Sequence, residues 1–137
     1  MLGISMGTET IVLLENEAGT RRLISEMLIL AGYEVREAAD STQAVRLIED
    51  GVHLADMLLA GMDTVGGEMP QLLRQQFPNL RVLLTSTQAD ESAIQTVAAS
   101  GAQVLPKPFS PGALMSKVRQ VLDQPVSQPA ARGASAG

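Results

Sequence analysis

The sequence contains no cysteine and very few aromatic residues. Without cysteine, a disulfide scaffold and a thiolate metal site are excluded, and the absence fits the reducing cytoplasm in which we expect this protein. Aromatic residues make up only 2% of the 137 residues, although 45% of the chain is hydrophobic. The core must therefore be built from aliphatic side chains and methionine, and its size suits one domain.

Positive charge and long apolar runs are also scarce. Ten Lys and Arg against fifteen Asp and Glu give a net charge of −5, which argues against nucleic acid as a partner, because binding to phosphate backbones depends on clustered basic residues. No apolar run approaches the roughly 18 residues that span a bilayer. The start, MLGISMG, lacks the basic region and apolar stretch of a signal peptide. We therefore expect no membrane partner.

The two ends of the chain differ in composition from the part between them. Residues 1–7 are predicted to be a flexible leader. Residues 124–137 (QPVSQPAARGASAG) are rich in small residues and proline and cannot bury enough apolar surface to offset the entropy of ordering them. We predict a disordered tail or linker stub there, and one folded domain over residues 8–123.

Strand and helix patterns alternate within this domain. Short apolar runs predict strands at 10–14, 33–38, 52–56, 80–85 and 102–106. Amphipathic stretches predict helices at 20–32, 42–50, 70–77, 90–101 and 111–123. Strict alternation implies an α/β fold, a doubly wound parallel sheet with helices on both faces. We predict the flavodoxin-like strand order 2-1-3-4-5, with the polar second strand at an edge.

Polar side chains follow these strands at their carboxyl ends, where ligands bind in such sheets. Glu15 and Asn16 follow the first strand, Asp56 ends the third, Thr85 ends the fourth and Lys107 follows the fifth. Because an ionised carboxylate is costly to bury without a partner, Asp56 in its apolar segment indicates a site. We expect these groups to converge on one rim of the sheet.

This combination suits phosphoryl chemistry. A carboxylate can act as a nucleophile and become an aspartyl phosphate. A hard cation held by oxygen ligands, usually Mg²⁺, neutralises the phosphoryl charge. A lysine and a hydroxyl can contact the same group.

Three segments carry a resemblance to a known family: GTETIVLLENEAGTRRL, AGYEVREAAD and LPKPFSPGALMSKVRQVLD. Over residues 8–123 the chain resembles the receiver domain of bacterial two-component response regulators, and the opening segment is most similar to receivers of hybrid sensor kinases. The resemblance implies that Asp56 is the phosphoacceptor. It implies that Glu15, Asn16, Asp56 and the backbone carbonyl of Leu58 hold Mg²⁺.

The resemblance assigns further roles near the predicted fourth and fifth strands. Thr85 matches the switch hydroxyl and Lys107 the phosphate-contacting lysine, with a cis bond before Pro108. Val104 stands where the family has a switch aromatic, and Asn16 replaces an aspartate, so we expect weakened Mg²⁺ binding. A further departure is Ala60, at a position where the family usually has proline.

We therefore expect a signalling domain rather than an enzyme. It would accept a phosphoryl group on Asp56 from a histidine kinase or phosphotransfer domain. The resemblance also leaves open homodimerisation through the fourth and fifth helices, which is common in the family. The alternative is a degenerate pseudo-receiver that acts as a phosphorylation-independent interaction module, favoured by Asn16, Ala60 and Val104. A small flavodoxin-like enzyme or nucleotide binder is a third, weaker alternative, because no Gly-rich phosphate loop follows the first strand.

Overall fold

The computed structural model describes residues 9–49, 55–61, 73, 75–86, 103–106 and 109–124. Its strands are β1 (Thr10–Leu14), β2 (Glu34–Ala38), β3 (Met57–Gly61), β4 (Arg81–Ser86) and β5 (Gln103–Pro106). Its helices are α1 (Ala18–Leu30), α2 (Ser41–Glu49) and α6 (Pro111–Asp123). Residues 73, 75 and 76 are helical, while the helix predicted at 90–101 lies outside the described residues.

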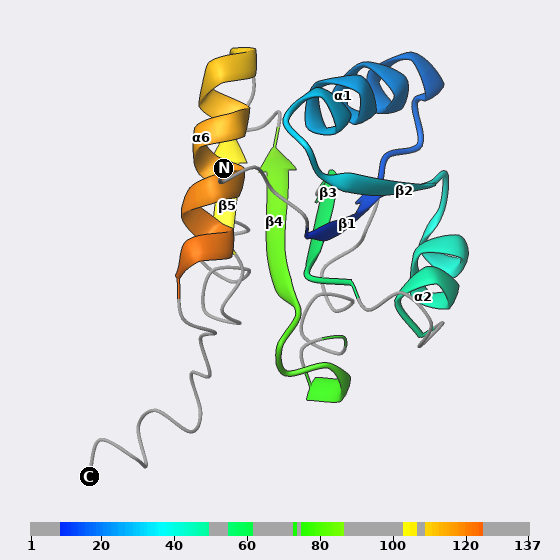
Figure 1. The fold of residues 1–137 in the computed structure, drawn as a ribbon. Coiled ribbons are helices and arrows are strands. Elements are labelled where there is room, and N and C mark those ends of the chain that lie inside the picture. Colours follow the sequence, from blue (N-terminus) through cyan, green and yellow to red (C-terminus); the bar gives the residue numbers. More distant parts are fainter. Residues whose placement is uncertain are drawn as a thin grey trace, which may run out of the picture.

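The five strands form one parallel sheet in the order β2-β1-β3-β4-β5 (Figure 1). This confirms the predicted α/β fold and strand order. Strands β1 and β3 are buried along their whole length, whereas β2 at the edge is largely exposed or half-buried. The difference follows from sequence, because β2 alternates charged and apolar residues while its neighbours are continuous apolar runs.

Two apolar clusters cover the two faces of the sheet. On one face, α1 and α6 pack on the central strands, and the buried residues are Ile11, Leu13, Ile24, Leu28, Tyr33, Met57, Leu59, Leu83, Leu114, Val118, Val121 and Leu122. On the other face lies α2, and the buried residues are Val12, Leu14, Ala38, Ala44, Ile48, Leu58, Ala60, Leu73, Leu80, Val82 and Leu84. Neighbouring strand residues alternate between the clusters, as the pleat requires.

The helix ends are set by short-range hydrogen bonds. The Ser110 hydroxyl accepts from the backbone N–H of Ala113 and caps α6. Gly32 follows α1 with φ of 99°, the left-handed conformation that glycine adopts without strain. At the start of α2, the Asp40 carboxylate accepts from the backbone N–H of Gln43, and Ser41 is already helical.

The third strand differs from its prediction. We expected residues 52–56 to form it and Asp56 to end it, but β3 runs from Met57 to Gly61 and Asp56 lies immediately before it. Residues 52–61 are nearly all apolar, so the pattern marks a strand in this segment without marking its ends. Pairing with β1 and β4 decides which five residues form the strand.

In the described part of the chain, no helix has the length and apolar content that a membrane crossing requires.

Candidate functional site

A row of residues crosses the sheet at the carboxyl ends of its central strands. Gly61, the last residue of β3, is the register partner of Thr85 in β4. The register between β1 and β3 brings Glu15, which follows β1, level with Gly61. Glu15, Gly61 and Thr85 therefore form a row of three neighbours, which we call the carboxyl-edge row.

All three positions of the carboxyl-edge row belong to one face of the sheet. Two residues earlier in the same strands stand Leu13, Leu59 and Leu83, which all lie in the cluster covered by α1 and α6. Since side chains alternate along a strand, positions two apart share a face. A side chain at position 61 would thus project between those of Glu15 and Thr85.

Both side chains in the row are buried. Glu15 is 6% exposed and Thr85 is 3% exposed. One carboxylate oxygen of Glu15 accepts a long hydrogen bond of 3.4 Å from the backbone N–H of Glu17. Arg21 donates to the backbone carbonyl of Glu15 at 2.8 Å and pairs with Glu37 at 3.3 Å. The Glu15 carboxylate therefore has a backbone donor, and the Arg21 guanidinium lies at the backbone of the same residue.

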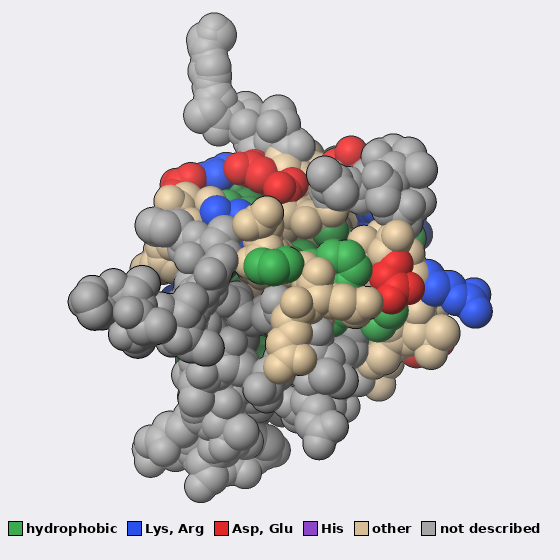
Figure 2. Space-filling model, turned by 90° about the horizontal axis from the view of Figure 1, so that it is seen from below, with side chains coloured by type: hydrophobic (Ala, Val, Ile, Leu, Met, Phe, Trp, Pro, Cys, Tyr) green, Lys and Arg blue, Asp and Glu red, His purple; other side chains and the backbone are tan. Residues whose placement is uncertain are grey.

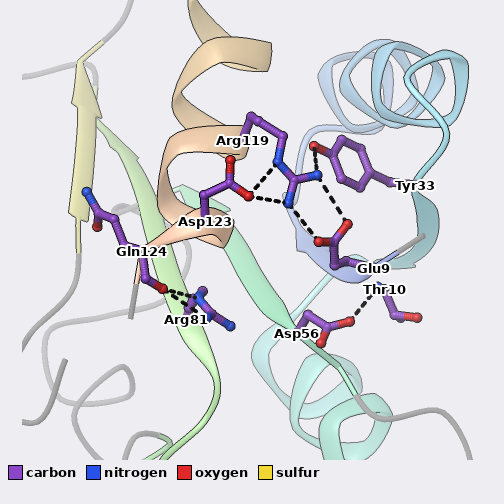
Figure 3. Close-up of polar contacts among 8 residues, drawn as sticks. All are labelled: Glu9, Thr10, Tyr33, Asp56, Arg81, Arg119, Asp123 and Gln124. Atoms are coloured by element: carbon purple, nitrogen blue, oxygen red, sulfur yellow. Dashed lines mark hydrogen bonds and ion pairs between the residues drawn. The ribbon is translucent and has the colours of Figure 1, made fainter. Parts of the chain in front are cut away.

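Asp56 lies at the opposite edge of the sheet, which corrects its predicted placement. One of its carboxylate oxygens accepts from the backbone N–H of Thr10 at 2.8 Å, at the start of β1 (Figure 3). Its backbone N–H donates to Thr10, and its carbonyl accepts from the N–H of Arg81, at the start of β4. Asp56 thus links three strands at their amino ends.

The separation between Asp56 and the carboxyl-edge row is large on the scale of chemistry. Five residues of extended chain lead from Asp56 to Gly61, which corresponds to about 17 Å at about 3.3 Å per residue. Groups that share a phosphoryl oxygen must lie within hydrogen-bond distance of it, about 3 Å. The phosphoacceptor role predicted for Asp56 is not supported by this geometry.

Two other predicted metal ligands, Leu58 and Asn16, lie at different positions relative to the carboxyl edge. Leu58 lies inside β3 with partners on both sides, so its carbonyl is part of the sheet and stands three residues before the strand's end. This position does not favour the Mg²⁺ role predicted for the Leu58 carbonyl. Asn16 follows Glu15 at the carboxyl edge, as predicted, and is exposed.

Two further predicted site residues, Lys107 and Pro108, lie outside the described residues. Val104 is described: it pairs with Leu84 in the sheet, is half-buried and packs against the core on the α2 side. The structure places Val104 next to the row, in register with the residue before Thr85. Its role as a degenerate switch position stays a prediction.

The carboxyl-edge row therefore combines one carboxylate, one hydroxyl and a glycine. Glycine offers no nucleophile, so the row lacks the acceptor that an aspartyl phosphate needs. Mg²⁺ prefers several oxygen ligands and usually one or two carboxylates together with phosphate oxygens. Within the residues that the structure describes, no three acidic, His or Cys side chains gather to hold a metal ion. This donor set does not fit Mg²⁺.

A second polar cluster, which the sequence analysis missed, lies at the amino edge. Arg119 of α6 binds Glu9 at 2.7 Å and Asp123 at 2.8 Å and donates to the hydroxyl of Tyr33 (Figure 3). The hydrogen bonds to Glu9 and Asp123 raise the pKa of the Arg119 guanidinium, and burial raises that of Tyr33. Only the (i, i+4) spacing of Arg119 and Asp123 was visible in the sequence.

Nearby, Arg81 donates two hydrogen bonds to the backbone carbonyl of Gln124, at 2.9 and 3.3 Å, just after α6 ends. Viewed from below, the molecule shows acidic and basic side chains next to one another on this side (Figure 2). The charges are thus paired rather than gathered into a patch of one sign. Pairing of this kind points to a structural role for the amino edge.

Comparisons with known proteins agree with the fold and the sequence motifs. A family model described as "Response regulator receiver domain" matches residues 11–119. The phosphate regulon transcriptional regulatory protein PhoB of Pseudomonas aeruginosa is 31% identical over 120 residues, which are 83% of this chain and 52% of PhoB. The sensor kinase CckA of Brucella abortus is 27% identical over 124 residues, 86% of this chain and 13% of CckA.

Solved structures show the same fold. A response regulator receiver domain protein from Clostridium thermocellum superposes with a TM-score of 0.77 at 19% identity, covering 84% of this chain and 94% of that one. The chain spans about half the length of PhoB and a much smaller part of CckA. These findings confirm the predicted family: the chain belongs to the response regulator receiver domains, the signalling domains of two-component signal transduction.

Proposed function

We propose that this domain is a receiver that works as a phosphorylation-independent interaction module in two-component signalling. Its partner would be a histidine kinase or a phosphotransfer domain, the proteins with which receiver domains interact. The observation that carries the proposal is Gly61. It stands between Glu15 and Thr85, where an acceptor carboxylate would have to lie.

The rest of the fold supports partner binding without phosphoryl transfer. The sheet is complete, its order is that of receiver domains, and both faces are closely packed. A partner that recognises the shape of this surface needs no acyl phosphate. Asp56 cannot replace the acceptor, because it lies at the other edge and its carboxylate already binds the N–H of Thr10.

A phosphoacceptor receiver is the second candidate function. Glu15 and Thr85, two of the side chains expected around a phosphoryl group, do lie in one row. The acceptor would then be a carboxylate other than Asp56. In the sequence, the first one after β3 is Asp63, which lies outside the described residues.

Intact-mass measurement after incubation with acetyl phosphate and Mg²⁺ separates the two functions. We expect the wild-type chain to gain no phosphoryl group, because position 61 has no nucleophile. The variant Asn16→Asp/Gly61→Asp should gain one, since a carboxylate then stands between Glu15 and Thr85. Asn16→Asp/Gly61→Asn is the matched control, with a side chain of the same size that cannot form an acyl phosphate.

A phosphoryl adduct on the wild-type chain would refute the proposal. Loss of that adduct in Asp63→Asn would assign the acceptor to Asp63, and loss in Asp56→Asn would restore the role first predicted for Asp56. A second readout is partner binding. The affinity for a cognate kinase should be the same with and without the phosphodonor.

A further inference from the structure

The carboxyl-edge row also bears on metal binding, and this inference rests on the proposed function because it concerns the same edge. We infer that the carboxyl edge of this domain does not bind Mg²⁺ at millimolar concentrations, unlike receiver domains in general. Partner binding at this edge should therefore not require Mg²⁺. The argument depends on the charges and donors at this edge.

The first step is the number of negative charges. A small, strongly hydrated cation loses its waters reluctantly and is held mainly by charged oxygen ligands. Of the described residues Glu15, Asn16 and Gly61 at the ends of β1 and β3, only Glu15 carries a negative charge, since Asn16 is neutral and Gly61 has no side chain. An amide oxygen can still ligate a hard cation, but it contributes no net charge to the attraction.

The second step is the geometry of the donors that remain. The Glu15 carboxylate is 6% exposed and accepts from the N–H of Glu17, so part of its capacity to accept is already used. The carbonyl of Leu58, the predicted backbone ligand, is inside the sheet. Among the described residues, no three acidic, His or Cys side chains gather at this edge to hold a metal ion.

The third step is the positive charge nearby. Arg21 lies against Glu15, donating to its backbone carbonyl at 2.8 Å, and its side chain is only 20% exposed. A guanidinium at the backbone of Glu15 adds positive charge to this edge and repels an incoming cation, and its partial burial reduces screening by salt. Charge, donors and repulsion all act against Mg²⁺ here.

The direct test is calorimetric titration of the wild-type chain with MgCl₂ at constant ionic strength, with a parallel thermal unfolding scan. We expect no saturable binding and no shift in Tm beyond that caused by NaCl of equal ionic strength. Saturable millimolar binding that Glu15→Gln abolishes would overturn the inference. Binding that survives Glu15→Gln lies elsewhere and leaves the edge without a cation, as inferred.

A gain-of-binding variant sharpens the test. Asn16→Asp/Gly61→Asp places three carboxylates together, so it should melt below wild type without Mg²⁺ and recover when Mg²⁺ is added. For Mg²⁺ at about 100 times the dissociation constant, the recovery should be on the order of 5–10 °C. Asn16→Asp/Gly61→Asn should show little recovery, and an equal recovery in wild type would contradict the inference.

The outcomes are independent of those that test the proposed function. Mg²⁺ binding at Glu15 without a phosphoryl adduct would refute this inference alone. An adduct on the wild-type chain without Mg²⁺ binding at the edge would refute the proposed function alone.

Discussion

At the scale of single residues, the role of a carboxylate depends on what it binds. Asp56 stands in an apolar segment, which suggested a reactive group. In the structure, its carboxylate accepts the N–H of Thr10 and its backbone joins β1 and β4. The hydrogen bond satisfies a backbone donor at the start of a buried strand. The Asp56 carboxylate therefore has a structural partner within the sheet, and its presence does not require a bound ligand.

Replacing Asp56 tests this structural role. Asp56→Ala removes a charge-assisted hydrogen bond and leaves the N–H of Thr10 without its acceptor, so the free energy of unfolding should fall by about 1–3 kcal/mol. Asp56→Asn should lose less, because its amide oxygen can still accept. Urea denaturation at neutral pH measures both, and an unchanged midpoint for Asp56→Ala would contradict the role.

At the scale of elements, helix α1 begins with a carboxylate that caps it. Glu17 is the N-cap: its side chain accepts from the hydroxyl and N–H of Thr20 and from the N–H of Gly19. These donors are otherwise unsatisfied at a helix start. A negative charge at this position also interacts favourably with the positive end of the helix dipole.

The cap predicts a pH dependence. Hydrogen bonds from the Thr20 hydroxyl, and then from its backbone N–H, hold the pKa of Glu17 below its ordinary value of 4.5. A lowered pKa in the folded state adds stability above the unfolded pKa, and that stability is lost as the pH falls through the folded value. Wild type should therefore exceed Glu17→Gln in stability at pH 7, by a margin that shrinks below pH 4.5.

Urea midpoints measured between pH 3 and pH 7 would test this dependence. Glu26→Gln is the matched control, because Glu26 lies in the middle of the same helix, away from its N-terminus, and pairs with Arg22. A margin for Glu17→Gln that is constant over this range would mean that the carboxylate does not cap the helix.

Strand β3 shows what local patterns leave open. Hydrophobic periodicity predicted β1, β4, β5 and α6 to within a residue or two, because polar residues, glycine or proline interrupt the chain around them. Within residues 52–61, His53, Asp56 and Gly61 interrupt the apolar residues at intervals that fit a strand on either side of Asp56. The displaced strand moved the predicted acceptor to the wrong edge and hid the importance of Gly61.

At the scale of the whole molecule, Arg119 joins the start of the folded chain to its end. Glu9 precedes β1, Tyr33 follows α1 and Asp123 ends α6, and the Arg119 guanidinium contacts all three (Figure 3). It also lies 5.8 Å from the centre of the Tyr33 ring, within range of a cation–π contact. These contacts connect the two ends of the folded chain at the amino edge of the sheet, opposite the carboxyl-edge row.

Substitution of Arg119 should remove these contacts and lower the stability of the fold. Arg119→Met keeps much of the aliphatic packing and removes the charge, so the free energy of unfolding should fall by about 1 kcal/mol, a modest value because the pairs are partly exposed. Arg119→Lys keeps one charge without the planar fork and should lose less. Denaturation in low and high salt checks this: the loss should diminish with salt, and a salt-independent loss would point to packing alone.

The sequence by itself determined the alternation of strands and helices, and with it the parallel sheet, the strand order and the family. These depend on local periodicity and on short motifs such as Ser110 before Pro111, which act between near neighbours. Only the tertiary structure decided that Gly61, rather than Asp56, stands level with Glu15 and Thr85. The physical reason is that register is set by hydrogen bonds between strands far apart in the chain, and one apolar segment can satisfy more than one register until its neighbours are present.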